Sequence, residues 1–316
     1  MLERDDVLFQ NPSPRCFPPP LSTLLISLKI FLRNKQLFLS IFALSTLPLS
    51  FLLFSLSLYI QPIKSRVYHL EAVAFLSSTR FESRHIWQES RADALSILRV
   101  KAFFFLPTYF LSLFTAITAV SSTASACQAK RPSLLSALTA VKLTWRRPLI
   151  TTILIYAMSL LYDQVPRTFA ALFGSPGSEF FVLVMGSAFE IYLMAVLSLG
   201  LVVSIVEEEL GWEAFRVGSG VMAGRRLSGW VLSGVFLLVS GSITRDLEMT
   251  TDGQDPSLET STMAMSVSTG MKDKLGLIVW YGIVVLWSYV VTTVFYLECR
   301  KQHVVRDDYE DESITI

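Results

Sequence analysis

The stretch LFLSIFALSTLPLSFLLFSLSLYI, residues 37–60, contains 24 residues without a charged side chain. The hydrocarbon core of a bilayer is about 30 Å thick, and an α-helix needs about 20 apolar residues to cross it. Backbone groups in lipid must bond within the segment, so a run of this kind is expected to be helical. The stretch therefore predicts a transmembrane span, and it argues against a soluble globular domain.

Apolar runs of similar length recur along the 316-residue chain. Of its residues, 52% are hydrophobic and 17% are charged, against about 45–50% and 25% in soluble domains. The third run ends at Asp163, and it needs the aliphatic stems of Arg146 and Arg147 to reach the interface. The runs predict an all-α fold with six spans at residues 37–60, 102–124, 148–162, 180–206, 227–244 and 275–297.

Lysine and arginine are distributed unevenly between the two sides that six spans create. The side with both termini carries 16 of the 27, and the other side carries 11. Cytosolic loops are enriched in these residues, so both termini are predicted to be cytosolic, in the endomembrane system or the plasma membrane. Cys16, Cys127 and Cys299 fall on the same side, where thiols stay reduced. No disulfide is therefore expected.

The regions outside the spans are expected to differ from one another in structure. A polar N-terminal tail (1–20) and an acidic C-terminal tail (299–316) flank a membrane domain at 21–298. Residues 61–101 have helical apolar spacing and form either two separate helices or extensions of the neighbouring spans. Residues 245–274 are rich in Ser and Thr and are expected to form a flexible loop. The C-terminal tail is expected to be disordered.

A short amphipathic helix is predicted before the first, third and fifth spans. Residues 24–44, 134–158 and 214–236 each read as an apolar-faced helix, then basic residues, then a span. This pattern predicts three hairpins, each preceded by a helix that lies in the cytosolic interface. For the first of these helices Ser22 is the expected N-cap. The alternative is that this helix simply lengthens the first span.

The residues that carry most enzymatic chemistry form no recognisable pattern in this sequence. We found no nucleophile motif, phosphate-binding loop or metal-ligand spacing. The net charge of +1 gives no reason to expect a nucleic-acid partner. The protein is therefore expected not to be an enzyme and to bind no cofactor or metal.

Glu190 is the candidate intramembrane polar site, because it lies ten residues into the predicted span 180–206. A charged side chain at this depth costs about 2.5–3.5 kcal/mol on insertion scales, so it usually faces the bundle interior or water. Glu190 is then either a proton or cation site in a transport path, or a protonated or hydrogen-bonded group that holds helices together. A third reading places it nearer the outer edge, if the span starts later.

The stretch SIVEEELGWEAFRVGSGVMAGRR, residues 204–226, separates the fourth and fifth spans. Its apolar residues recur at helical spacing. Glycine accepts the left-handed conformation that ends many helices, so Gly224 is the expected stop. The glutamates at 207–209 lie near the expected N-terminus, where the helix dipole favours negative charge. They are therefore interpreted as part of a helix cap.

The same stretch resembles a pattern found in a group of uncharacterised six-pass plant membrane proteins. More distantly, it is similar to the membrane domain that bacteria attach to some glycerophosphodiester phosphodiesterases. It departs from the pattern at Gly218, where the family tends to have Ser after a basic residue, whereas here Val217 precedes a glycine. The resemblance implies a membrane module without phosphodiesterase activity, since the catalytic domain is absent. The positions that carry it are Glu207, Gly211, Ala214, Gly218, Val221 and Gly224.

Two functions are compatible with these features. The first is a non-enzymatic integral membrane protein that organises a membrane or binds protein partners, with the lipid bilayer around it. The alternative is a transporter or channel for a small solute or lipid that uses Glu190.

Overall fold

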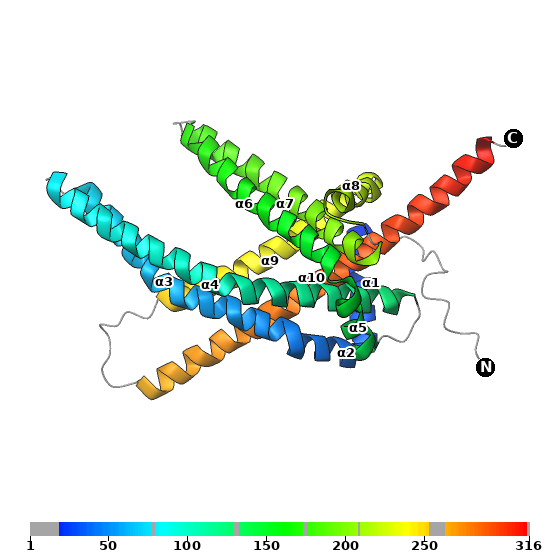
Figure 1. The fold of residues 1–316 in the computed structure, drawn as a ribbon, viewed down its shortest axis with the longest axis horizontal. Coiled ribbons are helices and arrows are strands. Elements are labelled where there is room, and N and C mark those ends of the chain that lie inside the picture. The colour runs from blue at the N-terminus through cyan, green and yellow to red at the C-terminus, as the bar shows by residue number, and fades with distance from the viewer. Residues whose placement is uncertain are drawn as a thin grey trace. The chain divides into compact units, whose positions relative to one another are not determined.

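The computed structural model describes residues 19–76, 80–128, 133–172, 176–207, 209–252 and 263–314, and these residues form helices and no strand (Figure 1). The all-α class is therefore confirmed. A π-helical turn, Phe42–Thr46, precedes α3, and a 3-10 turn, Met222–Gly224, follows α8. The helices are α1 (Pro19–Arg33), α2 (Lys35–Ile41), α3 (Leu47–Leu76), α4 (Arg80–Cys127), α5 (Leu134–Thr144), α6 (Arg146–Leu172), α7 (Pro176–Val206), α8 (Trp212–Val221), α9 (Arg226–Asp252) and α10 (Met263–Ile314).

Within the described residues, five helical segments are long and apolar enough to cross a membrane. They coincide with five of the predicted spans. The remaining predicted span, residues 148–162, lies in the first part of α6. The arrangement in three hairpins stays a prediction. Large hydrophobic side chains on these segments are exposed, among them Phe103 and Leu238, as expected of surfaces that face lipid. The five segments are Lys35–Ala74, Arg84–Cys127, Phe180–Val206, Arg226–Leu247 and Lys274–Gln302.

The chain divides into two compact units. The second unit comprises Phe42–Ser112 and Ser240–Ile283. The first unit contains the main hydrophobic core and the candidate site, and it is made of Met1–Ile41, Leu113–Val239 and Val284–Ile316.

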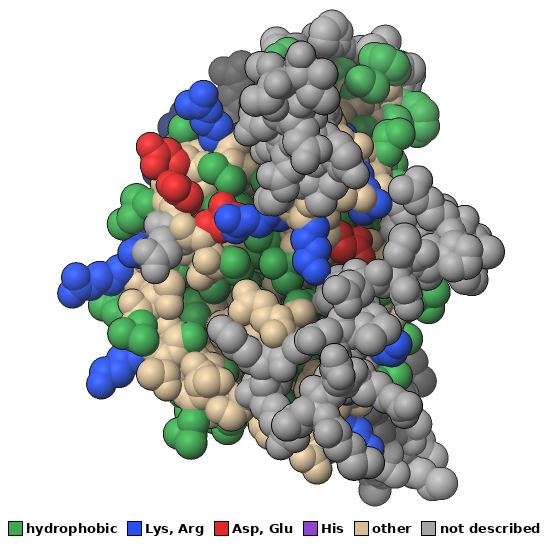
Figure 2. All heavy atoms as spheres, turned by 90° about the vertical axis from the view of Figure 1, so that its right-hand side faces the viewer, with side chains coloured by type: hydrophobic (Ala, Val, Ile, Leu, Met, Phe, Trp, Pro, Cys, Tyr) green, Lys and Arg blue, Asp and Glu red, His purple; other side chains and the backbone are tan. Residues whose placement is uncertain are grey.

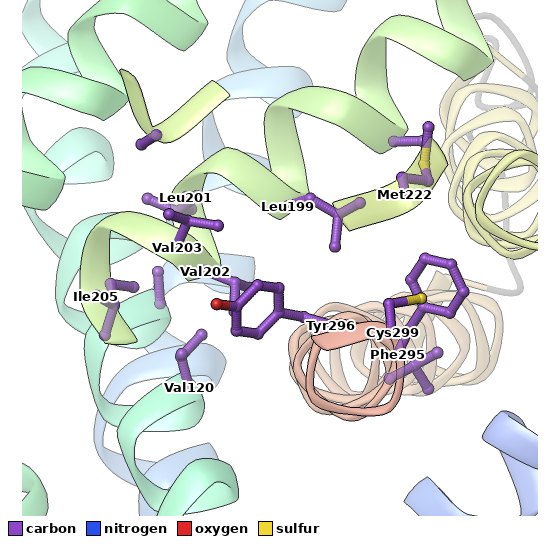
Figure 3. Packing of buried hydrophobic residues seen from close by; sticks show 14 of the residues in the cluster. Val120, Leu199, Leu201, Val202, Val203, Ile205, Met222, Phe295, Tyr296 and Cys299 are labelled. Carbon is purple, nitrogen blue, oxygen red and sulfur yellow. The ribbon is translucent and has the colours of Figure 1, made fainter. Parts of the chain in front are cut away.

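The core of the first unit is built from side chains of α4, α7, α8 and α10. Figure 3 shows Tyr296 projecting from α10 toward Val120 and Val202, while Phe295 and Cys299 lie nearer Met222. Each of these six residues is at most 3% exposed. Burying aliphatic and aromatic side chains on all these helices fixes their ends against one another.

Aromatic donors link helices of this unit through hydrogen bonds. The Tyr162 hydroxyl of α6 donates to the carbonyl of Gly186 in α7 at 2.5 Å, and these two helices run side by side (Figure 1). The Trp230 indole of α9 donates to the carbonyl of Ala188 at 2.9 Å. Such bonds hold helices together in lipid, where the hydrophobic effect contributes little between them.

In the second unit α3 and α4 continue as helices beyond the predicted spans. Residues 61–101 therefore extend the two spans, which is the second of the two expected alternatives. Arg66 of α3 pairs with Glu89 at 2.7 Å and with Asp93 at 3.2 Å, both on α4. Because Arg66 is 61% exposed, these pairs contribute little to stability.

Several predicted boundaries were wrong. α1 begins at Pro19, so Ser22 lies within the helix instead of at its N-cap; the fixed φ of proline suits a first helical turn. α1 is separated from α2 at Asn34, so it is not a simple extension of the first span. Most of residues 245–274 are helical, because α9 runs to Asp252 and α10 begins at Met263. α10 also continues to Ile314, through the expected disordered tail.

Candidate functional site

Two sets of polar contacts meet on α10 near the end of the last span. In the first, the carboxylate of Glu207, directly after α7, pairs with Arg300 and accepts a hydrogen bond from the Tyr296 hydroxyl. Arg300 Nη1 also donates to the Tyr296 hydroxyl at 3.2 Å. This set therefore joins the end of α7 to α10.

The second set is centred on Glu298. Its Oε2 accepts a hydrogen bond from Thr23 Oγ1 of α1 at 2.9 Å, and it lies 3.5 Å from Nη1 of Arg225, which directly precedes α9. The Glu298 side chain is 15% exposed. Two helices far apart in sequence, α1 and α9, are thereby attached to the same turn of α10.

We call these six residues the α10 clamp: Thr23, Glu207, Arg225, Tyr296, Glu298 and Arg300. Successive residues of an α-helix are rotated by about 100°, so Glu298 faces roughly opposite to Tyr296 and Arg300. The two sets therefore hold α10 from opposite sides. Glu207 and Arg225 lie on either side of α8 in the sequence, so the clamp fixes both ends of the α8 segment. Lysine, arginine and acidic side chains are visible on this face among hydrophobic ones (Figure 2).

The electrostatics of the clamp favour a structural role for its acids. The side chains of Glu207 and Glu298 are 14% and 15% exposed, and each has one arginine and one hydroxyl as partners. Removing one partner of a buried pair leaves an uncompensated charge, which is costly. Both carboxylates are thus engaged in linking helices, whereas a general base needs an accessible reacting proton nearby.

Gly211 and Gly218, two positions of the sequence motif, have identifiable structural roles. Gly211 has φ +60°, and its N–H donates to Thr151 Oγ1 of α6 at 3.2 Å. A Cβ on Gly218 would lie 3.1 Å from the backbone nitrogen of Gly200. The missing side chain thus lets α8 pack on α7, and Ala214, fully buried on the same face, continues this contact.

The interpretation of the glutamates as a cap of α8 was wrong. α8 begins at Trp212, and its N-cap is Gly211, which makes no side-chain hydrogen bond. Glu207 instead binds α10, and Glu208 lies outside the described residues. Gly224 was also misread, because it lies in the 3-10 turn and Gly211 is the one glycine with a positive φ in the described chain. Val221 is half-buried at the end of α8.

Glu190 lies in α7, away from the clamp in sequence, and it is partly buried. The preceding residue, Phe189, contacts Tyr162 of α6, with the ring centroids 5.5 Å apart. Glu190 lines neither the small cavity beside Ala195 and Phe295 nor the groove beside Arg33 and Lys35. Among the residues that the structure describes, no group of three or more His, Cys, Asp or Glu side chains converges as a metal site would require.

The cysteines Cys127 and Cys299 are free thiols near the clamp. Cys299 is 3% exposed within the core, and Cys127 is half-buried at the end of α4. Cys127 lies within electrostatic range of Glu298 and Lys301, so the end of α4 approaches the same part of α10. Cys16 lies outside the described residues.

Sequence reasoning found Glu207 but missed its partners on α10. The available signal was the sequence YLECR, residues 296–300, where charged side chains directly follow the last apolar run. In the sequence, the basic residues after the last apolar run predict only the orientation of the spans. Nothing in the local pattern relates residue 207 to residue 300.

The model of one protein family matches residues 22–311 of the chain; it is described as a domain of unknown function (DUF8558). No curated protein and no solved structure matches the chain. The matched region includes every residue of the α10 clamp, from Thr23 to Arg300.

Proposed function

The chain belongs to the DUF8558 family, and we propose that it is a six-span integral membrane protein without enzymatic activity. It organises a membrane by binding a protein partner at its cytosolic face. Both termini are cytosolic, and the membrane is that of the endomembrane system or the cell surface. No cofactor, metal or nucleic acid takes part. The likeness to six-pass plant proteins and, more distantly, to bacterial membrane domains fits such a module and stays a prediction.

The α10 clamp is the observation that carries this proposal. Its two acids are engaged by arginine and hydroxyl groups, so the charges at this face link helix ends. The clamp joins α1, α7, α9 and α10 at one place. Because the clamp already holds these helix ends together, the cytosolic surface that they form loses little conformational entropy when a partner binds. Such a surface favours partner binding over a lid-like or catalytic role.

The convergence of helix ends supports the six-span arrangement. Glu207 follows α7, Arg225 precedes α9, and Glu298 lies after the last predicted span. In three hairpins, spans two, four and six end on the cytosolic side, and span five begins there. Cys127, at the end of α4, is near the same residues. The remaining span is assigned to α6, which follows α5 directly.

Single-cysteine labelling tests this topology. Ser65→Cys, in the extension of α3, and Gln302→Cys, after the last span, both replace exposed side chains. With the native cysteines replaced, an impermeant maleimide added to sealed vesicles whose cytosolic face is outward is expected to label Gln302→Cys, and to label Ser65→Cys only after permeabilisation. With six spans, spans two to six lie between the two positions, so the two cysteines are on opposite sides of the membrane. If α6 does not cross, the number of crossings between them is even and both lie on the same side. Labelling of both from the same side would therefore contradict six spans.

Proximity labelling in native membranes tests partner binding. A biotin ligase fused to the C-terminus is expected to label a reproducible set of proteins that also identifies the compartment. Glu207→Gln, which weakens the clamp, is expected to reduce this set, while Glu213→Gln, an exposed acid of α8, leaves it unchanged. A set identical to that of an unrelated multi-pass protein in the same membrane would overturn partner binding.

The alternative function, transport through a path that uses Glu190, has one observation in its favour. A partly buried carboxylate lies in α7, directly after Phe189, whose ring contacts that of Tyr162 in α6. Reconstitution into liposomes with a proton or cation gradient tests it. Flux that is lost in Glu190→Gln and kept in Glu209→Gln, outside the span, would favour transport over the first proposal.

A further inference from the structure

An open groove lies between the junction of α1 with α2 and the start of α5. Its volume is about 400 Å³, which is within the range of small-molecule sites, about 300–1,000 Å³. All of its lining belongs to the first unit. The residues that line it are Arg33, Asn34, Lys35, Gln36, Leu37, Ser40, Ser133 and Leu134.

The groove is positively charged and polar. Arg33 and Lys35 are both exposed, and no carboxylate is among the described residues that line the groove. Two side-chain amides and two hydroxyls lie among the remaining lining residues, beside two leucines. Guanidinium groups bind phosphate through paired hydrogen bonds, and ammonium groups bind it as point charges. An anion is therefore the expected ligand, and phosphate matches both cations.

The position of the groove in the sequence places it at the level of lipid headgroups. Leu37, on its wall, is the first residue of the uncharged run that begins the first span. Large leucine side chains are exposed beside the lining residues: Leu32 is 61% exposed, Leu39 is 67% and Leu135 is 77%. A ligand with a charged head and long apolar chains fits a basic groove with such flanks.

α1 supplies a second reason to expect lipid here. Its leucines, spaced by three or four residues, are exposed, while Thr23 and Ser27 on its other face are buried. Thr23 binds Glu298, and Ser27 accepts a hydrogen bond from the Trp287 indole at 3.3 Å, both on α10. The helix thus turns Thr23 and Ser27, together with Ile30, toward the protein and four of its leucines outward. The exposed leucines are Leu21, Leu25, Leu28 and Leu32.

We propose that the groove binds the headgroup of an anionic glycerophospholipid, with Arg33 and Lys35 paired to its phosphate. The acyl chains then lie along the exposed leucines. This site rests on the membrane location proposed above, but it requires neither a protein partner nor a particular orientation.

Native mass spectrometry of the detergent-solubilised full chain tests the proposal. Phosphatidylglycerol, phosphatidylcholine and inorganic phosphate are each titrated against the wild-type protein. Phosphatidylglycerol is expected to bind most tightly. Arg33→Gln with Lys35→Gln is expected to weaken it roughly thirtyfold, since each cation near an anionic headgroup contributes about fivefold. Lys29→Gln, an exposed cation on α1 outside the groove, is the matched control and is expected to change affinity less than about threefold.

Three results would overturn the proposal. Equal weakening by Lys29→Gln would mean a diffuse surface charge, and equal binding of phosphatidylcholine would mean that no anion is selected. Inorganic phosphate that binds as tightly as the lipid and displaces it would identify a soluble phosphate ligand. If the double variant does not fold, Ser40→Trp provides the second test, because a bulky side chain fills the groove and is expected to exclude the lipid. None of these readouts depends on the topology or the partner experiments.

Discussion

At the scale of single residues, three glycines of one motif have different roles. Gly211 is needed for its positive φ and Gly218 for close packing, whereas Gly224 has neither a positive φ nor an atom near its missing side chain. The sequence singled out all three. It did not distinguish them, because the contact of Gly218 is with Gly200, on another helix, and local spacing carries no information about it.

Gly218→Ala is predicted to destabilise the protein by about 1–3 kcal/mol, the usual cost of forcing an extra methyl group into a packed site. The added Cβ would meet backbone atoms of Gly200 and Leu199 at 3.1 and 3.3 Å, and backbone of α7 has little freedom to move. Thermal unfolding in detergent measures the effect. Gly220→Ala is the control in the same helix: no atom lies within 4 Å, so it is expected to be neutral or stabilising by up to about 1 kcal/mol. Equal losses in both variants would contradict the packing argument.

Gly211→Ala is predicted to cost about 1–3 kcal/mol through backbone strain. Its φ of +60° and ψ of −118° are rarely adopted by residues with a side chain, and a Cβ would lie 3.2 Å from Leu154 Cδ1. The same unfolding measurement applies. Gly276→Ala in α10, with open space around its Cβ, should be tolerated, and tolerance of Gly211→Ala as well would rule out the strain.

At the scale of elements, apolar spacing predicted the helices well and their ends poorly. α8 was predicted from the positions of its apolar residues, and its buried face includes Ala214 and Phe215. The segment 245–274 was misjudged because serine, threonine and acidic residues are typical of loops, yet several of its other residues are good helix formers. Helical spacing reports what a helix can bury, whereas its ends depend on neighbouring packing and caps.

Ser133→Ala is predicted to destabilise α5 by about 1 kcal/mol. Ser133 Oγ accepts from the Ser136 N–H at 3.1 Å, and Ser136 Oγ accepts from the Ser133 N–H at 3.2 Å, which is a reciprocal cap. Hydrogen exchange at the first turn of α5 measures the loss directly. Ser133→Asp should restore protection, because aspartate also accepts at an N-cap. Thr139→Ala, within the same helix, should not reduce it.

At the scale of the whole molecule, the six apolar runs were readable from the sequence and the links between them were not. The α10 clamp joins residues separated by up to 275 positions. The number of lysine and arginine residues on each side predicts only which side is cytosolic. It contains no information about which acid each of them pairs with. Long-range partners of this kind follow from packing of the folded helices, which no single sequence pattern contains.

A double-mutant cycle on Glu207→Gln and Arg300→Gln is predicted to give a coupling energy of about 1 kcal/mol, measured from unfolding in detergent. Arg300 is 49% exposed, so the coupling is expected to fall as salt is raised from about 0.05 to 0.5 M. The exposed pair of Arg66 and Glu89 is the control and should couple more weakly. Equal coupling in the two cycles would remove the distinction between the clamp and an ordinary surface pair.

The inward polar face of α1 has a consequence for biosynthesis. Thr23 finds Glu298 only after 275 further residues have been made, which takes about 15 to 55 s at translation rates of about 5–20 residues per second. During that interval the Thr23 hydroxyl of α1 lacks its Glu298 partner. The docking of α1 onto α10 must therefore be among the last steps of assembly. A chain that stops before the last span leaves Thr23 and Ser27 without their partners on α10. Quality control can distinguish incomplete chains from finished ones by this feature.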